Sequence, residues 1–337
     1  MPSERQLIQR IRKRAQNLDP DLRVPIGDDA AVLDWSASVR LVVAKDVMVE
    51  DRHFRRNWTV PEFLAEKSLA VNLSDLAAMG ARPRGSLLGL TLPPRLPPDF
   101  ATRFLDHFVD FADRMKCPLL GGDLSGGSQL HISVTALGGL SGEPWLRGGG
   151  QAGDCLLLVG KAGLAAAGLA ELERIGSLPH SLRTRQELRR FCHRQHLPAK
   201  FLEAHLLPSV YLEEAAWFSA HTDVHAAIDI SDGLAGDLMQ VAEESRLQIV
   251  LDWSFLQALR EPESERLRLD NVLGGGEDYS LALALSSRDW ECVQEDYPET
   301  LSKPHRIGEL VAGPPGIVIR RDETIDPLPT NRYDHFS

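Results

Sequence analysis

The stretch from residue 59 to residue 83 constrains the fold of this chain most, because it specifies one long helix with two different faces. Thr59 and Glu62 have the spacing of a capping box, and Pro61 falls in the first turn, where a missing N–H is tolerated. Gly80, with a proline three residues later, predicts the end of the helix. We therefore predict a helix of about five turns.

Two stripes of side chains run along this helix at the i, i+4, i+7 spacing. One stripe is apolar and predicts a core face; it consists of Leu69, Leu73 and Leu76. The neighbouring stripe is polar; it consists of Ser68, Asn72 and Asp75. A solvated face is usually filled with Lys and Glu, whereas short polar residues favour local bonding or ligation. The second stripe is therefore either a plain polar face or part of a binding site.

Length and charge limit the kinds of partner. With 337 residues the chain has room for two domains with substantial cores. Its net charge is −11, with 48 acidic and 37 basic residues, so no overall field attracts nucleic acid or an anionic membrane. We expect neither nucleic acid nor membrane as a partner. A phosphorylated ligand must then be bound through metal ions or a local cluster of groups.

The cysteines and the apolar runs indicate in which cell compartment the protein is located. The four cysteines are scattered without a CxxC pair, which suits buried thiols in a reducing environment; they are Cys117, Cys155, Cys192 and Cys292. The first residues contain no apolar signal region, and apolar runs such as residues 155–159 are too short to cross a bilayer. These features predict a cytoplasmic protein.

The first half of the chain is predicted to be rich in β-strands with two long helices. The second of these helices, residues 99–115, carries four phenylalanines at helical spacing, which we interpret as core residues. In the run 117–127 a short buried strand is expected to break into a glycine-rich loop around Asp123. Other strand-like runs lie at 24–33, 39–54, 86–94 and 130–140.

A glycine-rich linker at residues 146–154 separates the two halves. We predict an N-terminal domain over residues 1–147 and a C-terminal α/β domain over residues 148–337. Residues 176–200 are rich in Arg, His and Gln with little apolar periodicity, and are interpreted as a surface insertion.

The C-terminal domain repeats one local form, in which a strand and an acidic turn adjoin each other. A helix is predicted at about 164–175, and residues 224–245 read as a strand, an Asp-rich turn and a helix from near Asp232. Residues 271–285 read as a glycine-rich turn, two acids and a strand.

Six aspartates lie beside strand ends, turns or the polar helix stripe; they are Asp29, Asp46, Asp75, Asp123, Asp229 and Asp232. If they gather in one pocket, their mutual repulsion raises their pKa values unless cations bind. Carboxylate oxygens select Mg²⁺ or Ca²⁺, and Mg²⁺ is usually held together with substrate phosphates. Each aspartate alone also fits a turn or cap residue, so the argument depends on the whole set.

Three glycine-rich segments can bring backbone N–H groups close to phosphate oxygens; they are GGD (121–123), SDG (231–233) and GGGED (274–278). None matches the GxxxxGK[ST] pattern or the GxGxxG pattern, so the common nucleotide-binding folds are disfavoured.

Several sequence blocks, in this order and at these separations, resemble the thiamine-monophosphate kinase family; they are GDDAAVL, the D-VMVE-RHF stretch from Asp46 to Phe54, KSLAVNLSDLAAMGARP, GGD, DISDGLAGDL, GGGEDY and the terminal YDHF. That family belongs to the PurM-like, or aminoimidazole-ribonucleotide-synthetase, superfamily. The resemblance implies an α/β (α+β) fold of two PurM-like domains. It also implies a homodimer whose N-terminal domains pair into a barrel-like sheet.

The resemblance also implies roles for individual residues. The six aspartates match the Mg²⁺ ligands of the family. Four residues match ATP-binding positions: Gly122, Asp123, Arg147 and Ser231. His53 and Glu277 match positions that bind the substrate. The implied reaction is the transfer of a phosphoryl group from ATP to thiamine monophosphate, with no catalytic group beyond the metal and phosphate ligands.

The chain departs from the family at three places. Ala44-Lys45 replaces Ser-Thr, the run Leu124–Gly127 replaces Thr-Thr-Arg-Gly, and an expected aromatic residue is missing near Thr330. We expect the Lys45 ammonium to lie among the carboxylates and to substitute for one Mg²⁺, unless it points to solvent. Two other hypotheses remain open: a diverged paralogue that phosphorylates another small molecule, and a non-catalytic nucleotide-binding protein.

Overall fold

The computed structural model describes residues 6, 10, 11, 13, 14, 22–24, 32, 33, 35, 38–260, 267–322 and 324–328. The chain divides into two compact units, each of mixed α/β structure, as predicted. The first unit takes in residues 1–76, 82–143 and 172–199, and the second takes in residues 77–81, 144–171 and 200–337. The domain boundary between residues 147 and 148 stays a prediction.

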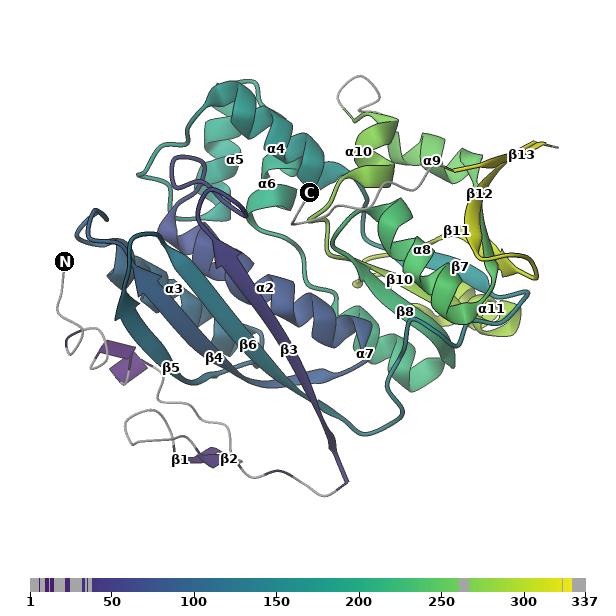
Figure 1. Cartoon of the computed structure of the whole chain (residues 1–337), viewed down its shortest axis with the longest axis horizontal. Helices are drawn as coiled ribbons and strands as arrows, with labels where there is room; N and C mark the ends of the chain where they lie inside the picture. Colours follow the sequence, from purple (N-terminus) through teal and green to yellow (C-terminus); the bar gives the residue numbers. More distant parts are fainter. Residues whose placement is uncertain are drawn as a thin grey trace. The chain divides into compact units, whose positions relative to one another are not determined.

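The first unit is built on a four-stranded sheet (Figure 1). Its strands are β3 (Arg40–Val49), β4 (Arg82–Leu92), β5 (Leu119–Gly126) and β6 (His131–Leu140). They lie in the order β3-β6-β4-β5; β4 and β5 are parallel and the other pairs are antiparallel. Two short strands, β1 (Leu22–Val24) and β2 (Val32–Leu33), form a separate antiparallel pair.

Helices α2 (Pro61–Ala78) and α3 (Phe100–Arg114) lie on one side of this sheet (Figure 1). Both were predicted, and the four phenylalanines of α3 are buried. The chain leaves α2 at Gly80, whose φ of 69° favours glycine. The predicted capping box is wrong, because the Glu62 carboxylate instead binds the Arg103 guanidinium at 2.7 and 2.8 Å.

The two faces of the sheet differ in exposure because neighbouring residues of a strand point to opposite sides. On β3, Ala44 and Met48 face the helices and are buried. The alternate residues face away from the helices, and the large apolar side chains of this outer face are 41–56% exposed; they are Leu41, Val43, Val47 and Leu87.

The segment predicted as a surface insertion contains a further helix, α5 (Arg185–Arg194). It begins at a complete capping box, in which the Thr184 side chain accepts from Glu187 N and Glu187 accepts from Thr184 N. Leu188 and Cys192 bury a narrow apolar face. The segment is also hydrogen-bonded to the loop between β3 and α2, since Asn57 Nδ2 donates to Gly176 O at 2.7 Å.

The second unit is built on a seven-stranded sheet in the order β13-β12-β9-β11-β7-β10-β8. Its strands are β7 (Cys155–Val159), β8 (Val224–Ile230), β9 (Gln248–Asp252), β10 (Ser280–Leu285), β11 (Pro304–Val311), β12 (Gly316–Arg321) and β13 (Thr324–Pro327). Neighbouring strands are antiparallel except β9 and β12, which are parallel. The remaining helices are α4 (Leu164–Ile175), α6 (Ala199–Leu206), α7 (Leu212–His221), α8 (Leu234–Ser245), α9 (Trp253–Arg260), α10 (Leu269–Gly274) and α11 (Ser287–Asp296).

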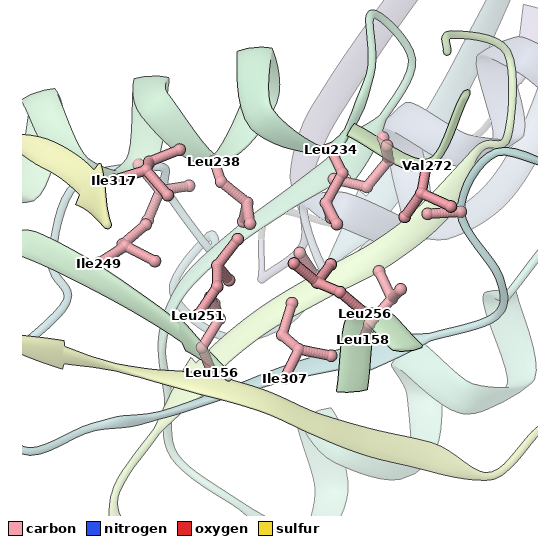
Figure 2. Packing of buried hydrophobic residues seen from close by; sticks show 14 of the residues in the cluster. Leu156, Leu158, Leu234, Leu238, Ile249, Leu251, Leu256, Val272, Ile307 and Ile317 are labelled. Atoms are coloured by element: carbon pink, nitrogen blue, oxygen red, sulfur yellow. The ribbon is translucent and has the colours of Figure 1, made fainter. Parts of the chain in front are cut away.

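Helices bury both faces of this sheet, which explains the uninterrupted apolar runs of its central strands. On β7, Leu156 and Leu158 join a core with Leu234 and Leu238 of α8 (Figure 2). The alternate residues of β7 join a second core with Phe218 of α7. The acidic turns that follow β8 and precede β10 are thereby fixed to the ends of buried strands.

The structure tests two further expectations. Three cysteines are buried thiols as expected, but Cys292 is exposed. Among the residues that the structure describes, no helix is both long enough and apolar enough to cross a membrane.

Candidate active site

Asp46 is tied to the polar stripe of α2. Its backbone N–H donates to Asn72 Oδ1 at 3.1 Å, and Asn72 Nδ2 donates to Ser68 O at 3.1 Å. Burial raises the pKa of Asp46, while the charges of His53 and Lys45 act to lower it. The buried members of the stripe, Ser68 and Asn72, therefore serve local bonding. Asp75 is half-buried on the same helix, and its metal-binding role stays a prediction.

His53 closes the turn that follows β3. Its Nδ1 accepts a hydrogen bond from Val49 N at 3.0 Å, and its own backbone N–H donates to Val49 O at 2.9 Å. Asp51, between them, has a φ of 64°. Because Nδ1 accepts, the neutral imidazole carries its proton on Nε2. The ring therefore has a structural task in addition to the substrate contact predicted for it.

Lys45 lies on the outer face of the sheet, on the side opposite to Asp46. Its Nζ donates to Ser133 Oγ at 2.6 Å. Adjacent residues on a strand point to opposite faces, so the ammonium is directed away from the Asp46 carboxylate. This geometry does not support the hypothesis that Lys45 replaces a metal ion beside Asp46.

Asp123 and Gly122 lie within strand β5 and not in the predicted loop. Asp123 is exposed and pairs with Gly89 in the parallel ladder to β4. A Cβ atom at Gly122 would lie 1.9 Å from the carbonyl oxygen of Leu88, so only glycine fits there. Glycine at this position is thus explained by strand packing, whatever its part in ATP binding.

In the second unit, the turn after β8 is held by a residue that the sequence analysis missed. Asp237 Oδ2 accepts hydrogen bonds from Ser231 N and Asp232 N, both at 2.9 Å. Burial, together with the charges of Asp232 and Asp229, raises the pKa of Asp237 to about 7, although the two backbone hydrogen bonds act to lower it. Asp237 was overlooked because an acid in the first turn of a helix is ordinary, although it belongs to the block DISDGLAGDL.

Arg147 connects to the same group of residues. Its Nη1 donates to Gln240 Oε1 at 2.5 Å, and Gln240 Nε2 donates to Asp237 Oδ1 at 3.1 Å. The exposed guanidinium, predicted to bind ATP, is thus linked through one amide to the residue that shapes the turn at Ser231.

The glycine-rich turn before β10 is bonded to the turn after β8. Glu277 N donates to Ser231 O at 2.7 Å, and a Cβ atom at Gly276 would lie 2.5 Å from the same oxygen. Glu277 and Tyr279 have φ values of 68° and 51°, in the left-handed region that non-glycine residues rarely adopt. The structure therefore brings together Ser231, Asp232 and Glu277, which were predicted from two separate motifs.

Asp278, next in the chain, caps helix α4. Its carboxylate accepts from Gly163 N at 2.5 Å and from Ala165 N at 2.9 Å. Burial, and to a smaller extent the charge of Glu277, raises its pKa to about 7, although the hydrogen bonds from the helix act to lower it. Asp278 fixes the turn but is covered by the helix terminus.

No group of three or more His, Cys, Asp or Glu side chains within the described ranges is arranged to hold a metal ion. Asp29 lies outside the described residues, as do Thr330 and the terminal YDHF block. The metal, ATP and substrate assignments therefore stay predictions.

Two family models match the chain and define its class. The model of the AIR synthase related protein N-terminal domain matches residues 27–140, and that of the C-terminal domain matches residues 151–320. Together they cover most of the chain and correspond to the two units, except that residues 172–199, which the C-terminal model matches, belong to the first unit, and residues 77–81, which the N-terminal model matches, belong to the second. The fold is therefore that of the AIR synthase related proteins.

Comparison with individual proteins shows to which family within this class the chain belongs. The thiamine-monophosphate kinase of Mycobacterium tuberculosis is 36% identical over 76% of this chain and 72% of its own length. The crystal structure of the enzyme from Stenotrophomonas maltophilia superimposes with a TM-score of 0.77 at 33% identity, covering 93% of this chain and 95% of that one. A structure described as AaThiL complexed with AMPPCP and TMP gives a TM-score of 0.71 at 25% identity, covering 99% and 97%. The chain belongs to the thiamine-monophosphate kinase family.

Proposed function

We propose that this chain transfers the terminal phosphoryl group of ATP to thiamine monophosphate, giving thiamine diphosphate and ADP. Membership of the thiamine-monophosphate kinase family supports this function, as does the likeness over nearly the whole chain to a protein bound to AMPPCP and TMP. The observation that carries the proposal is the hydrogen bond from Glu277 N to Ser231 O, because it joins a turn with a predicted substrate residue to a turn with a predicted ATP residue.

The phosphoryl transfer requires little acid–base catalysis from the protein. The attacking group is a phosphate oxygen that is already ionised, so the task is to align two anionic groups. We assign Arg147, Gly122, Asp123 and Ser231 to ATP, and His53 and Glu277 to thiamine monophosphate. Backbone N–H groups and the Arg147 guanidinium suit phosphate oxygens, whereas the Glu277 carboxylate suits the cationic thiazolium or the amino group of the substrate.

The charges of the acidic residues in the second unit favour a bound divalent cation, although among the described residues these side chains are not arranged as a complete metal site. Burial and the charges of Asp232 and Asp229 raise the pKa of Asp237 to about 7, and a bound cation would relieve this repulsion. We propose that Asp229 and Asp232 are Mg²⁺ ligands, and we assign the same role to Asp29, Asp46, Asp75 and Asp123. When bound, Mg²⁺ supplies charge neutralisation and alignment of the phosphates.

We further propose that the outer face of the four-stranded sheet pairs two chains into a homodimer. Leu41, Val43, Val47 and Leu87 are 41–56% exposed on a single face, and such a patch is typical of a protein interface. Pairing would place the sheet of one N-terminal domain face to face with that of another, as in the barrel-like sheet predicted for the dimer. We also assign the protein to the cytoplasm, an inference that depends on its free thiols.

A coupled assay of ADP release tests the function. We expect turnover that requires both thiamine monophosphate and Mg²⁺, and that is abolished by a chelator. The Asp232→Asn variant should lose ATP affinity, whereas Asp270→Asn, at a side chain that is 83% exposed, should not. Turnover with another small acceptor but not with thiamine monophosphate would identify a diverged paralogue. ATP binding without any turnover would identify a non-catalytic protein.

A further inference from the structure

His205, on helix α6, contacts the predicted substrate residue Glu277. Its Nδ1 lies 3.2 Å from Glu277 Oε2, which is an ion-pair distance, but the contact does not have the geometry of a hydrogen bond. The His205 side chain is 7% exposed, whereas that of Glu277 is 28% exposed. One carboxylate oxygen thus faces a buried imidazole, and part of the same side chain remains accessible to a ligand.

The position of His205 is fixed by the packing of α6 against α4. A Cβ atom at Gly168 would lie 2.1 Å from Phe201 O and 3.0 Å from His205 Cβ, so the two helices meet at a residue without a side chain. The N-terminus of α4 is capped in turn by Asp278, the neighbour of Glu277. Contacts through α6, α4 and Asp278 therefore connect the His205 imidazole to the segment that carries the Glu277 carboxylate.

The backbone of Glu277, like the position of His205, is fixed by its contacts. Its N–H donates to Ser231 O at 2.7 Å, and its φ of 68° is maintained by the bonded turns. With the backbone fixed, the remaining freedom of Glu277 lies in its side-chain torsions. The contact between His205 and Glu277 Oε2 favours one of the side-chain rotamers of Glu277.

We propose that His205 is a positioning residue that holds the Glu277 carboxylate in the orientation needed to bind thiamine monophosphate. The inference rests on the proposed function, since it adds a residue to the substrate part of that site. A proton on Nδ1 makes the contact attractive and leaves the other carboxylate oxygen available for an N–H group or the cationic ring of the substrate. Freezing the side chain before binding reduces the entropy lost when the substrate binds.

Two substitutions at position 205 separate positioning from packing. His205→Phe keeps the ring volume beside Gly168 but removes the ring nitrogen that faces Glu277, whereas in His205→Asn the side-chain amide nitrogen can take the place of Nδ1. We expect His205→Phe to raise the Kd and the KM for thiamine monophosphate by about tenfold, with kcat and the KM for ATP nearly unchanged. His205→Asn should recover most of the affinity. Calorimetry in the absence of ATP gives the Kd without turnover.

A double-mutant cycle completes the test. Because His205 acts through Glu277, His205→Phe should add little to the loss already caused by Glu277→Gln. Additive losses, an equal loss of ATP affinity, or a Kd unchanged in His205→Phe would each overturn the role of His205 while leaving the kinase assignment intact. Failure of the unaltered chain to bind thiamine monophosphate would overturn both. The midpoint of thermal unfolding, measured for every variant, shows whether a loss of affinity comes from a loss of fold.

Discussion

Asp237 Oδ2 lies 2.9 Å from the backbone nitrogen of Ser231 and accepts its hydrogen bond, so helix α8 holds the turn that precedes it. The same oxygen accepts from Asp232 N, and the side chain is only 1% exposed. Two predicted ligand residues thus take their backbone positions from a third residue. The carboxylate that shapes the turn is a different one from those expected to bind the cation.

Replacing Asp237 by Asn should weaken both the fold and the binding of ATP. An amide offers one acceptor oxygen in place of two, so either the turn or Gln240 loses its partner. We expect a fall of roughly 1–3 kcal/mol in the free energy of unfolding, as for a buried polar group left unsatisfied. Denaturant unfolding and calorimetric titration with ATP measure the two effects. Asp270→Asn is the matched control, and unchanged ATP affinity in Asp237→Asn would show that the turn needs no such support.

The stability of the second unit should depend on pH through Asp278. Its pKa is raised from 3.8 to about 7 in the folded state, so the folded chain binds more protons than the unfolded chain between these values. Stability from this group is therefore fully present below about pH 4 and is lost as the pH rises to 7, by at most about 1.4 kcal/mol per pH unit.

The Asp278→Asn variant isolates this effect, because its amide stays neutral throughout. The free energy of unfolding of the unaltered chain, minus that of the variant, should fall between pH 4 and pH 7 and then level off. Chemical unfolding at several pH values gives the difference, and Asp270→Asn again serves as the control. A constant difference across this range would mean that the carboxyl group is already ionised in the folded chain at pH 4.

Two glycines of strand β5 give a matched pair for the first unit. A Cβ atom at Gly122 would lie 1.9 Å from Leu88 O, whereas a Cβ atom at Gly126 meets no atom within 4 Å. Gly122→Ala must push β5 away from β4 and should cost about 2 kcal/mol or more, but Gly126→Ala should be nearly neutral. The midpoint of denaturant unfolding measures both variants. Equal midpoints would exclude close strand contact as the reason for glycine at position 122.

The sequence was sufficient to predict those helices and strands that depend on a local pattern of residues. The helix that became α3 could be predicted because its phenylalanines recur at helical spacing and bury one face. Helix α5 escaped prediction because only Leu188 and Cys192 bury its apolar face, and charged residues surround them. Asp123 was expected in a loop because glycines precede and follow it, yet parallel pairing with β4 keeps it in a strand. That pairing is a long-range contact and leaves no local signal.

The candidate site was predictable in its residues but not in their connections. Ser231 and Glu277 were found from separate motifs, and only the folded chain shows the hydrogen bond between them. Asp237 lies within the block DISDGLAGDL but acts through the backbone of other residues, and His205 belongs to no motif. The orientation of Lys45 followed from strand alternation, which the sequence analysis did not apply to Ala44 and Lys45.

The final prediction concerns His53, where a structural and a substrate role must be separated. Its Nδ1 accepts from Val49 N, so His53→Ala removes a substrate contact and an acceptor of the turn at once. His53→Asn keeps an acceptor, because the side-chain oxygen can take the place of Nδ1. We expect both variants to raise the KM for thiamine monophosphate tenfold or more, about 1.4 kcal/mol, while the KM for ATP changes less.

The two substitutions at position 53 should affect the stability of the turn differently from the affinity for the substrate. Only His53→Ala is expected to lower the midpoint of thermal unfolding, since only this variant leaves Val49 N without its acceptor. Steady-state kinetics with each substrate varied in turn, together with thermal unfolding, distinguishes the two roles. If His53→Asn restores both the midpoint and the KM for thiamine monophosphate, the imidazole serves the turn alone. Glu277, with His205 behind it, would then be the residue that recognises the substrate.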